Sequence, residues 1–230
     1  MDLKIFDMYN IRARLSVYVI LLTPIVVTLY ALYEPIRSLS FSVISVAILS
    51  AFSNYLFAVQ RYMQRNNSYK NTAAELLYPN DHRIDDCTKQ RYYQRLSKIE
   101  KRFEIFNTPS ESEEFKLACV SAVQWLRDNT RDNRLVQEEN MLCGFYKNLL
   151  SFKCCGILFA IGAMIILLVE VSPISIITFC KTKVYLGLAA FDVLFILFWV
   201  FGVKEEMRAV LTEKYAKALL GALDKINIQN

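Results

Sequence analysis

The sequence predicts an all-α, four-span helical membrane protein in which two antiparallel transmembrane hairpins flank a helical cytosolic domain. Hydrophobic residues make up 54% of the 230 residues and charged residues only 21%, which is too apolar for an ordinary soluble domain of this size. The apolar residues are concentrated in two blocks, 15–59 and 154–203, and the stretch between them has a normal soluble composition. No alternating strand pattern and no Asn-Gly hairpin turn occurs in the chain.

Each apolar block contains two runs long enough to cross a bilayer. They are Leu15–Tyr33, Leu39–Val59, 154–171 and 184–203. At about 1.5 Å rise per residue, runs of this length match a hydrocarbon core of about 30 Å. The link 34–38 is so short that the first two spans must form a hairpin, and a short loop closes the second. A cleavable signal peptide is the alternative for the first run, but no small-residue cleavage site follows it.

The distribution of lysine and arginine predicts the orientation, because positive residues near span ends stay on the cytoplasmic side. The segments 1–14, 60–153 and 204–230 together hold 24 of the 27 Lys and Arg residues. Only Arg37, Lys181 and Lys183 lie in the two short links. We therefore expect a multi-pass protein of the plasma membrane whose termini and central domain are cytoplasmic.

The cytosolic segments are expected to be helical throughout. In chain order we expect a continuation of the second span up to Pro79, an amphipathic helix over Ile84–Phe106, a helix with an apolar stripe over Phe115–Leu126, a helix from Leu135 that runs straight into the third span, and an amphipathic helix over Lys204–Ile226 whose stripe includes Met207 and Val210. Ser110 and Glu113 form a capping box at the start of the third of these helices. Long helices thus continue from the second span and into the third.

Five serines lie along one side of the second predicted span. Ser38, Ser42, Ser45, Ser50 and Ser53 fall within an arc of roughly 140°, extended by Asn54, at about 100° per residue. Such a stripe can line a pore that passes ions when several subunits assemble. Tight helix packing needs the same small residues, so both interpretations stay open.

Asp192 is an acid near the middle of the fourth predicted span. Placing a carboxylate there costs about 2.5–3.5 kcal/mol on insertion scales, and an intramembrane acid therefore marks a functional site by default. We include Asp192 among the pore-lining candidates. The alternative is a buried acid bonded to Ser, Thr or Asn of a neighbouring helix.

Basic residues cluster on the polar side of the predicted Ile84–Phe106 helix. They are Arg91, Arg95, Lys98, Lys101 and Arg102. Such a cluster could bind a phosphate-rich ligand. However, residues 60–153 hold 16 basic and 13 acidic residues, and this balance favours a solvated face.

The residues that catalysis or metal binding require are scarce. The chain has one histidine, His82, and its six cysteines form no CxxC pair. No phosphate-binding glycine loop, nucleophile elbow or metalloprotease motif is present. We therefore expect no enzymatic activity, no resident cofactor and no metal site.

Two membrane hairpins around a helical cytosolic insert resemble the four-transmembrane anti-phage effectors that bacteria encode beside nucleotidyltransferases, including SMODS-associated and Hailong-type pore-forming effectors. The stretch from Leu135 to Leu149, which leads into the third span, is similar to such bacterial proteins. The resemblance implies a homo-oligomeric channel of the inner membrane, with a tetramer as the expected assembly. It also implies gating by a nucleotide or oligonucleotide from a partner nucleotidyltransferase, and depolarisation of an infected cell.

The leading hypothesis is thus an oligomeric ion channel gated through its cytosolic helices, with the lipid bilayer, further copies of itself and a nucleotide ligand as partners. A non-conducting membrane scaffold that recruits a cytosolic partner is the alternative. A small-solute transporter is disfavoured because the sequence shows no repeat of interrupted spans, and Pro24 is the only proline inside a span.

Overall fold

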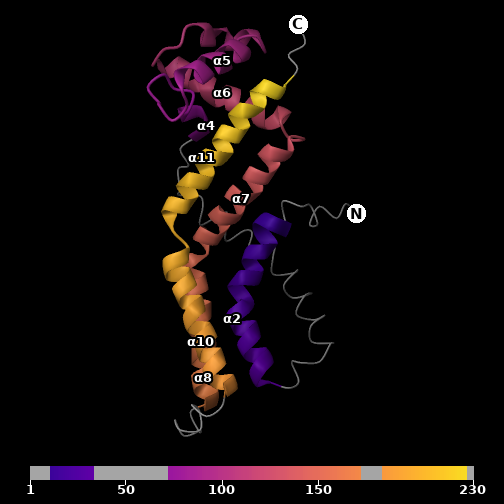
Figure 1. Cartoon of the computed structure of the whole chain (residues 1–230), viewed down its shortest axis with the longest axis vertical. Coiled ribbons are helices and arrows are strands. Elements are labelled where there is room, and N and C mark those ends of the chain that lie inside the picture. Colours follow the sequence, from indigo (N-terminus) through magenta and orange to yellow (C-terminus); the bar gives the residue numbers. More distant parts are fainter. Residues whose placement is uncertain (1–10, 34–71, 172–182, 227–230) are drawn as a thin grey trace. The chain divides into compact units, whose positions relative to one another are not determined.

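A computed structural model of the chain describes residues 11–33, 72–171 and 183–226 (Figure 1). Every regular element in these ranges is a helix, which confirms the predicted all-α class for the part of the chain described. The described residues divide into two compact units. We call residues 11–33, 144–171 and 183–207 the apolar unit, and residues 72–143 and 208–226 the polar unit. The second predicted span lies outside the described residues.

The apolar unit contains three helices that are long and apolar enough to cross a membrane: Ala13–Leu32, Lys153–Glu170 and Lys183–Gly202. The elements that form them are the π-helix η2 (Ile11–Leu15) with α2 (Ser16–Leu32), then α8 (Lys153–Val171), and then α10 (Lys183–Leu197) with the π-helix η5 (Phe198–Gly202). They coincide with the first, third and fourth runs chosen from the sequence. They are compatible with a membrane protein, while the four-span arrangement stays a prediction.

Small side chains on α8 let the other two helices approach it closely. The buried residues described on α8 are Gly156, Ala160, Ala163 and Leu167, and α8 packs along both α2 and α10 (Figure 1). Large apolar side chains such as Leu158, Leu168 and Leu194 point away from this seam and are more than half exposed. Small residues inside and large apolar residues outside are the pattern of helices that pack in lipid.

The polar unit is built around an aromatic and aliphatic core. Its elements are α4 (Thr72–Glu75), α5 (Asp86–Leu96), η4 (Lys101–Asn107), α6 (Glu113–Asn129), η6 (Ala222–Lys225), the first part of α7 (Arg134–Ser151) and the second part of α11 (Glu205–Gly221). The rings of Tyr93 and Phe106 stack at 5.8 Å, and Phe115 meets Phe106 edge-on at 5.3 Å. This core supplies the apolar burial that holds the short elements together.

The predicted single helix over Ile84–Phe106 is wrong. α5 ends at Leu96, and the chain re-enters a helix only at Lys101, as the 3₁₀-helix η4. The hydroxyl of Ser97 donates to the Gln94 carbonyl at 3.1 Å, a local bond that competes with helix continuation. The break places Phe103 and Phe106, each 1% exposed, in the core, so tertiary packing overrides the helical period.

Two predicted helix boundaries are also wrong. α6 begins two residues later than the capping box predicts, because the hydroxyl of Ser112, not of Ser110, accepts from the Phe115 N–H at 3.2 Å. α4 ends at Glu75 and not at Pro79. After Glu75 the backbone hydrogen bonds tighten to three-residue spacing, from the Leu77 N–H to the Ala74 carbonyl and from the Tyr78 N–H to the Glu75 carbonyl, and this turn buries both Leu76 and Leu77 completely.

The predicted continuation into the third span is confirmed. α7 ends at Ser151 and α8 starts at Lys153, so only Phe152 separates them. Backbone hydrogen bonds still cross that residue, from the Phe152 N–H to the Asn148 carbonyl and from the Gly156 N–H to the Phe152 carbonyl.

The predicted C-terminal helix is present as α11 and η6. Its stripe is partly wrong. Met207 and Val210 are about half exposed, whereas Leu211, Leu219 and Ala222 are buried.

Candidate functional site

Asp192 lies inside the apolar unit and is 0% exposed. It shares the buried face of its helix with Leu188, one turn before it, and Trp199, two turns after it. The hydroxyl of Thr28 on α2 is the polar group next to the Asp192 carboxyl. Thr28 is also 0% exposed. Yet neither Asp192 oxygen nor the Thr28 hydroxyl has a partner with hydrogen-bond geometry among the described residues. The structure therefore places an acid and a hydroxyl together without satisfying either.

The wall beside this site depends on a glycine. Trp199 is completely buried and its indole ring lies directly over Gly156 of α8. A Cβ at position 156 would stand 2.1 Å from the Trp199 Cε2 atom, which is far inside van der Waals contact. Gly156 is therefore the residue that allows the indole to pack against α8.

The end of the fourth span is fastened to the start of the third by two side chains. The Lys153 ammonium donates to the Val200 carbonyl at 3.1 Å and to the Val203 carbonyl at 2.7 Å. The Tyr146 hydroxyl donates to the Gly202 carbonyl at 3.3 Å and accepts from the Lys204 N–H at 2.8 Å. These bonds satisfy backbone groups that the break between η5 and α11 leaves without helical partners.

The start of the first span is tied to the same region. The buried amide of Asn148 donates to the Ala13 carbonyl, and Tyr18 meets Phe152 edge-on at 5.7 Å. The residues between Tyr146 and Gly156 thus contact both the first and the fourth predicted span. The serine stripe, with Ser38, Ser42, Ser45, Ser50, Ser53 and Asn54, lies outside the described residues.

The basic candidates do not form one free cluster. Arg91 and Arg95 both bind Asp224 of η6, at 3.1 and 3.2 Å, and Arg95 also donates to the Leu223 carbonyl at 3.0 Å. Arg102 pairs with Glu100 at 2.5 Å and covers the Phe103 ring. Lys98 and Lys101 are exposed and make no ion pair with any described residue. Arg91 and Arg95, which the sequence predicts as ligand-binding residues, therefore bind the C-terminal segment around η6.

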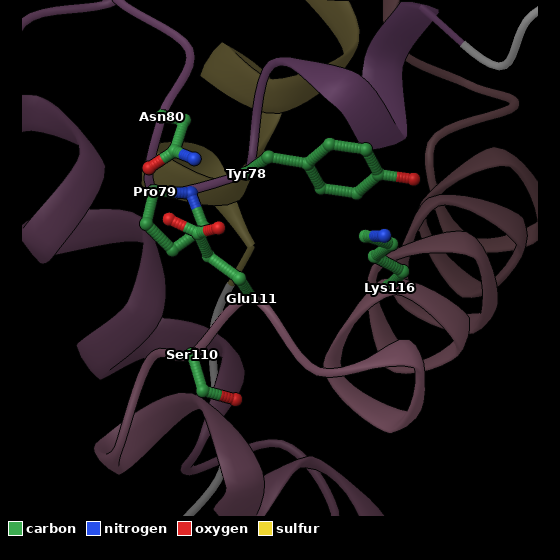
Figure 2. A pocket seen from close by; sticks show the side chains of 6 residues that line it. All are labelled: Tyr78, Pro79, Asn80, Ser110, Glu111 and Lys116. Atoms are coloured by element: carbon green, nitrogen blue, oxygen red, sulfur yellow. The ribbon is translucent and has the colours of Figure 1, made fainter.

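The polar unit carries a small open pocket that sequence reasoning missed. It encloses about 170 Å³ between the turn after α4 and the loop before α6, and is lined by Tyr78, Pro79, Asn80, Ser110, Glu111 and Lys116 (Figure 2). The Tyr78 hydroxyl and the Lys116 amine lie on the same side of it (Figure 2). Lys116 is already bonded to Glu113 at 2.5 Å, which raises its pKa. The only sequence features that marked this place were two helix-breaking prolines, Pro79 and Pro109.

A buried lysine closes the turn next to this pocket. Lys89 is 3% exposed and donates to the Tyr78 carbonyl at 2.9 Å and to the Asp81 carbonyl. The Asp81 carboxylate in turn binds Arg83, and although burial opposes it, this hydrogen bond lowers the pKa of Asp81. Lys89, Asp81 and Arg83 are thus bonded to groups in and next to the turn.

The described residues contain no cluster of metal ligands. Burial raises the pKa of Cys119 in the core to about 12, so this thiol is chemically inert. No family model, curated protein or solved structure matches the chain.

Proposed function

We propose that the protein is a homo-oligomeric membrane ion channel whose spans respond to its helical cytosolic domain. The observation that supports this most is the Asp192 carboxyl, which is fully buried among apolar helices with both oxygens unpaired by the described residues. An acid at this depth costs about 2.5–3.5 kcal/mol. Packing alone would be served as well by an apolar residue, so the acid indicates a role in charge movement.

The links at the span ends support coupling between the spans and the cytosolic helices. Tyr146 and Lys153 hold the backbone where η5 ends and α11 begins. If α11 shifted along its axis, these bonds would either break or move Tyr146 and Lys153 with it. The same stretch holds Ala13 through Asn148, so one displacement would reach both the first and the fourth span.

The gating signal is proposed to be an anionic nucleotide or oligonucleotide, within bacterial anti-phage defence. Exposed Lys98 and Lys101 are available to it. Arg91 and Arg95 would bind it only by releasing Asp224, to which they are now paired. This part of the proposal rests on the architectural resemblance and on these charges.

One observation favours the alternative, a non-conducting scaffold that recruits a cytosolic partner. Both Asp192 oxygens are enclosed by helices of a single chain, whereas a pore-lining acid faces water. Under this alternative, Asp192 and Thr28 would serve only to align α2 and α10.

Ionic current through the full-length protein in planar bilayers distinguishes the two. We expect discrete currents that Asp192→Asn removes for the most part, while detergent sizing shows an unchanged oligomer. Glu170→Gln is the matched control, because Glu170 is exposed at the far end of α8, where it accepts a hydrogen bond from the Tyr33 hydroxyl. Equal currents in the wild type, Asp192→Asn and Glu170→Gln would exclude a role of Asp192 in conduction. The absence of any current, with and without an oligonucleotide, would support the scaffold. Ser45→Leu tests the serine stripe in the same assay.

A further inference from the structure

We infer that Asp192 and Thr28 form a proton-binding pair within the apolar unit. The Asp192 carboxyl holds a proton and can donate it in a hydrogen bond to the Thr28 hydroxyl oxygen. The inference rests on the proposed function for its meaning in gating, but proton binding itself does not require that the protein conducts.

The first argument is the mutual lack of partners. Both carboxyl oxygens of Asp192 and the hydroxyl of Thr28 are buried, and each lacks a hydrogen bond among the described residues. An ionised carboxylate accepts at about four positions and donates at none, whereas a neutral carboxyl has one donor and fewer acceptor sites to satisfy. A single neighbouring hydroxyl can satisfy only one of the carboxylate's acceptor positions and leaves the others empty, so the site as a whole favours the neutral acid.

The second argument is the distance of every other charge on the same three helices. The remaining titratable side chains described on α2, α8 and α10 are Tyr18, Tyr30, Lys153, Cys154, Cys155, Glu170, Lys183 and Tyr185. Lys183, the one cation of α10, is nine residues before Asp192, or about 14 Å along the helix. Lys153 lies at the start of α8 and donates to the Val203 carbonyl. Glu170 lies near the other end of α8 and accepts a hydrogen bond from the Tyr33 hydroxyl. Arg14, on η2 at the start of the first span, lies fourteen residues before Thr28, or about 21 Å along that helix. No described cation on the three spans is therefore placed to neutralise an Asp192 carboxylate, so a proton is the counter-charge that fits.

The pair has a mechanical consequence. When Asp192 loses its proton, the resulting carboxylate needs water or a cation, and either one requires space between α2 and α10. Those helices are packed through Thr28 and Asp192, both 0% exposed. Ionisation would therefore separate α2 from α10, and proton binding would bring them together.

Carbodiimide labelling tests the inference on the full-length protein in liposomes. The hydrophobic reagent dicyclohexylcarbodiimide adds a protonated carboxyl across one of its C=N bonds to give an O-acylisourea. In an apolar site this adduct rearranges to a stable N-acylurea without losing any atoms. We expect peptide mass spectrometry to find the adduct on Asp192 at neutral pH, with labelling that declines as the pH rises. Asp192→Asn should remove the adduct, and Glu170→Gln should leave it in place.

Thr28→Val provides the second variant. It removes a hydroxyl whose bond to an ionised carboxyl is stronger than its bond to a neutral one, so half-labelling should move up by about one pH unit. An unchanged midpoint would remove Thr28 from the pair. No adduct on Asp192 in the folded protein would overturn the inference. Protection by sodium chloride but not by choline chloride at fixed pH would replace the proton with a metal cation. If Asp192 is labelled but the protein carries no current, the proton site stands and the channel proposal is rejected. If the protein carries current but Asp192 is not labelled, the channel proposal stands and the proton site is rejected.

Discussion

Gly156→Ala is predicted to destabilise the apolar unit through one contact. The added methyl would stand 2.1, 2.4 and 2.5 Å from three atoms of the Trp199 indole. The indole is rigid and 0% exposed, so either Trp199 or the α8 backbone must shift. Overpacking of this kind costs about 1–3 kcal/mol.

Gly162→Ala is the matched control, because it adds the same methyl to the same helix with nothing within 4 Å. Ala is a better helix former than Gly by about 0.5–1 kcal/mol, so this variant should be neutral or slightly stabilised. The helix-forming gain is common to both variants, so thermal unfolding in detergent should show Gly156→Ala about 2–12 °C below Gly162→Ala, at about 2–4 °C per kcal/mol for a chain of this size.

A double variant separates the clash from a general helix effect. Trp199→Leu alone leaves a cavity and should cost about 2–5 kcal/mol. In its presence Gly156→Ala should cost little, because the atoms it strikes are gone, and the coupling between the two sites should exceed about 1 kcal/mol. Equal melting temperatures for Gly156→Ala and Gly162→Ala would refute the reasoning and with it the placement of the indole against α8.

Two further predictions concern hydroxyl groups of tyrosine. Tyr146→Phe removes a donor to the Gly202 carbonyl and an acceptor for the Lys204 N–H, so it should cost about 1–3 kcal/mol and increase amide hydrogen exchange at Lys204 without changing the oligomer. Burial raises the pKa of Tyr93, whose hydroxyl donates to the Leu77 carbonyl at 2.5 Å; the stability it contributes is therefore complete below pH 10, the ordinary pKa of tyrosine, and is lost as the pH rises through the higher folded value. Chemical denaturation should show the polar unit losing stability above pH 10, and Tyr93→Phe should reduce that slope; an unchanged slope would exclude Tyr93 as its source.

The sequence predicts the three long apolar helices of the described residues well. The reason is that each residue in such a run contributes its own free energy of transfer into an apolar environment. The runs at Leu15–Tyr33, 154–171 and 184–203 contain almost no charge, and three long apolar helices occupy them. Asp192 is conspicuous for the same reason, because it is a charge near the middle of such a run, whereas Glu170 lies at the end of one. Its neighbour Thr28 could not be predicted, because Thr28 lies on a helix that is 164 residues earlier in the chain.

Sequence reasoning fails where a distant partner decides the structure. The break after Leu96 follows from the packing of Phe106 against Tyr93 and Phe115 and of Phe103 against Phe106. The local pattern, by contrast, favours a continuous helix. Gly156 gave no signal either, because a glycine in a span is common and only the position of Trp199 makes it necessary.

The basic residues of α5 illustrate the same limit and bear on the proposed ligand. Arg91 and Arg95 are 52% and 35% exposed where they meet Asp224, so each ion pair contributes no more than about 1 kcal/mol. A ligand with several phosphate groups can offer each arginine an anionic group of its own, whereas Arg91 and Arg95 now share the single carboxylate of Asp224. The pairing with Asp224 therefore does not close this face to a polyphosphate ligand. Binding of the proposed ligand to both arginines would require release of the segment that contains Leu223, whose carbonyl Arg95 also holds.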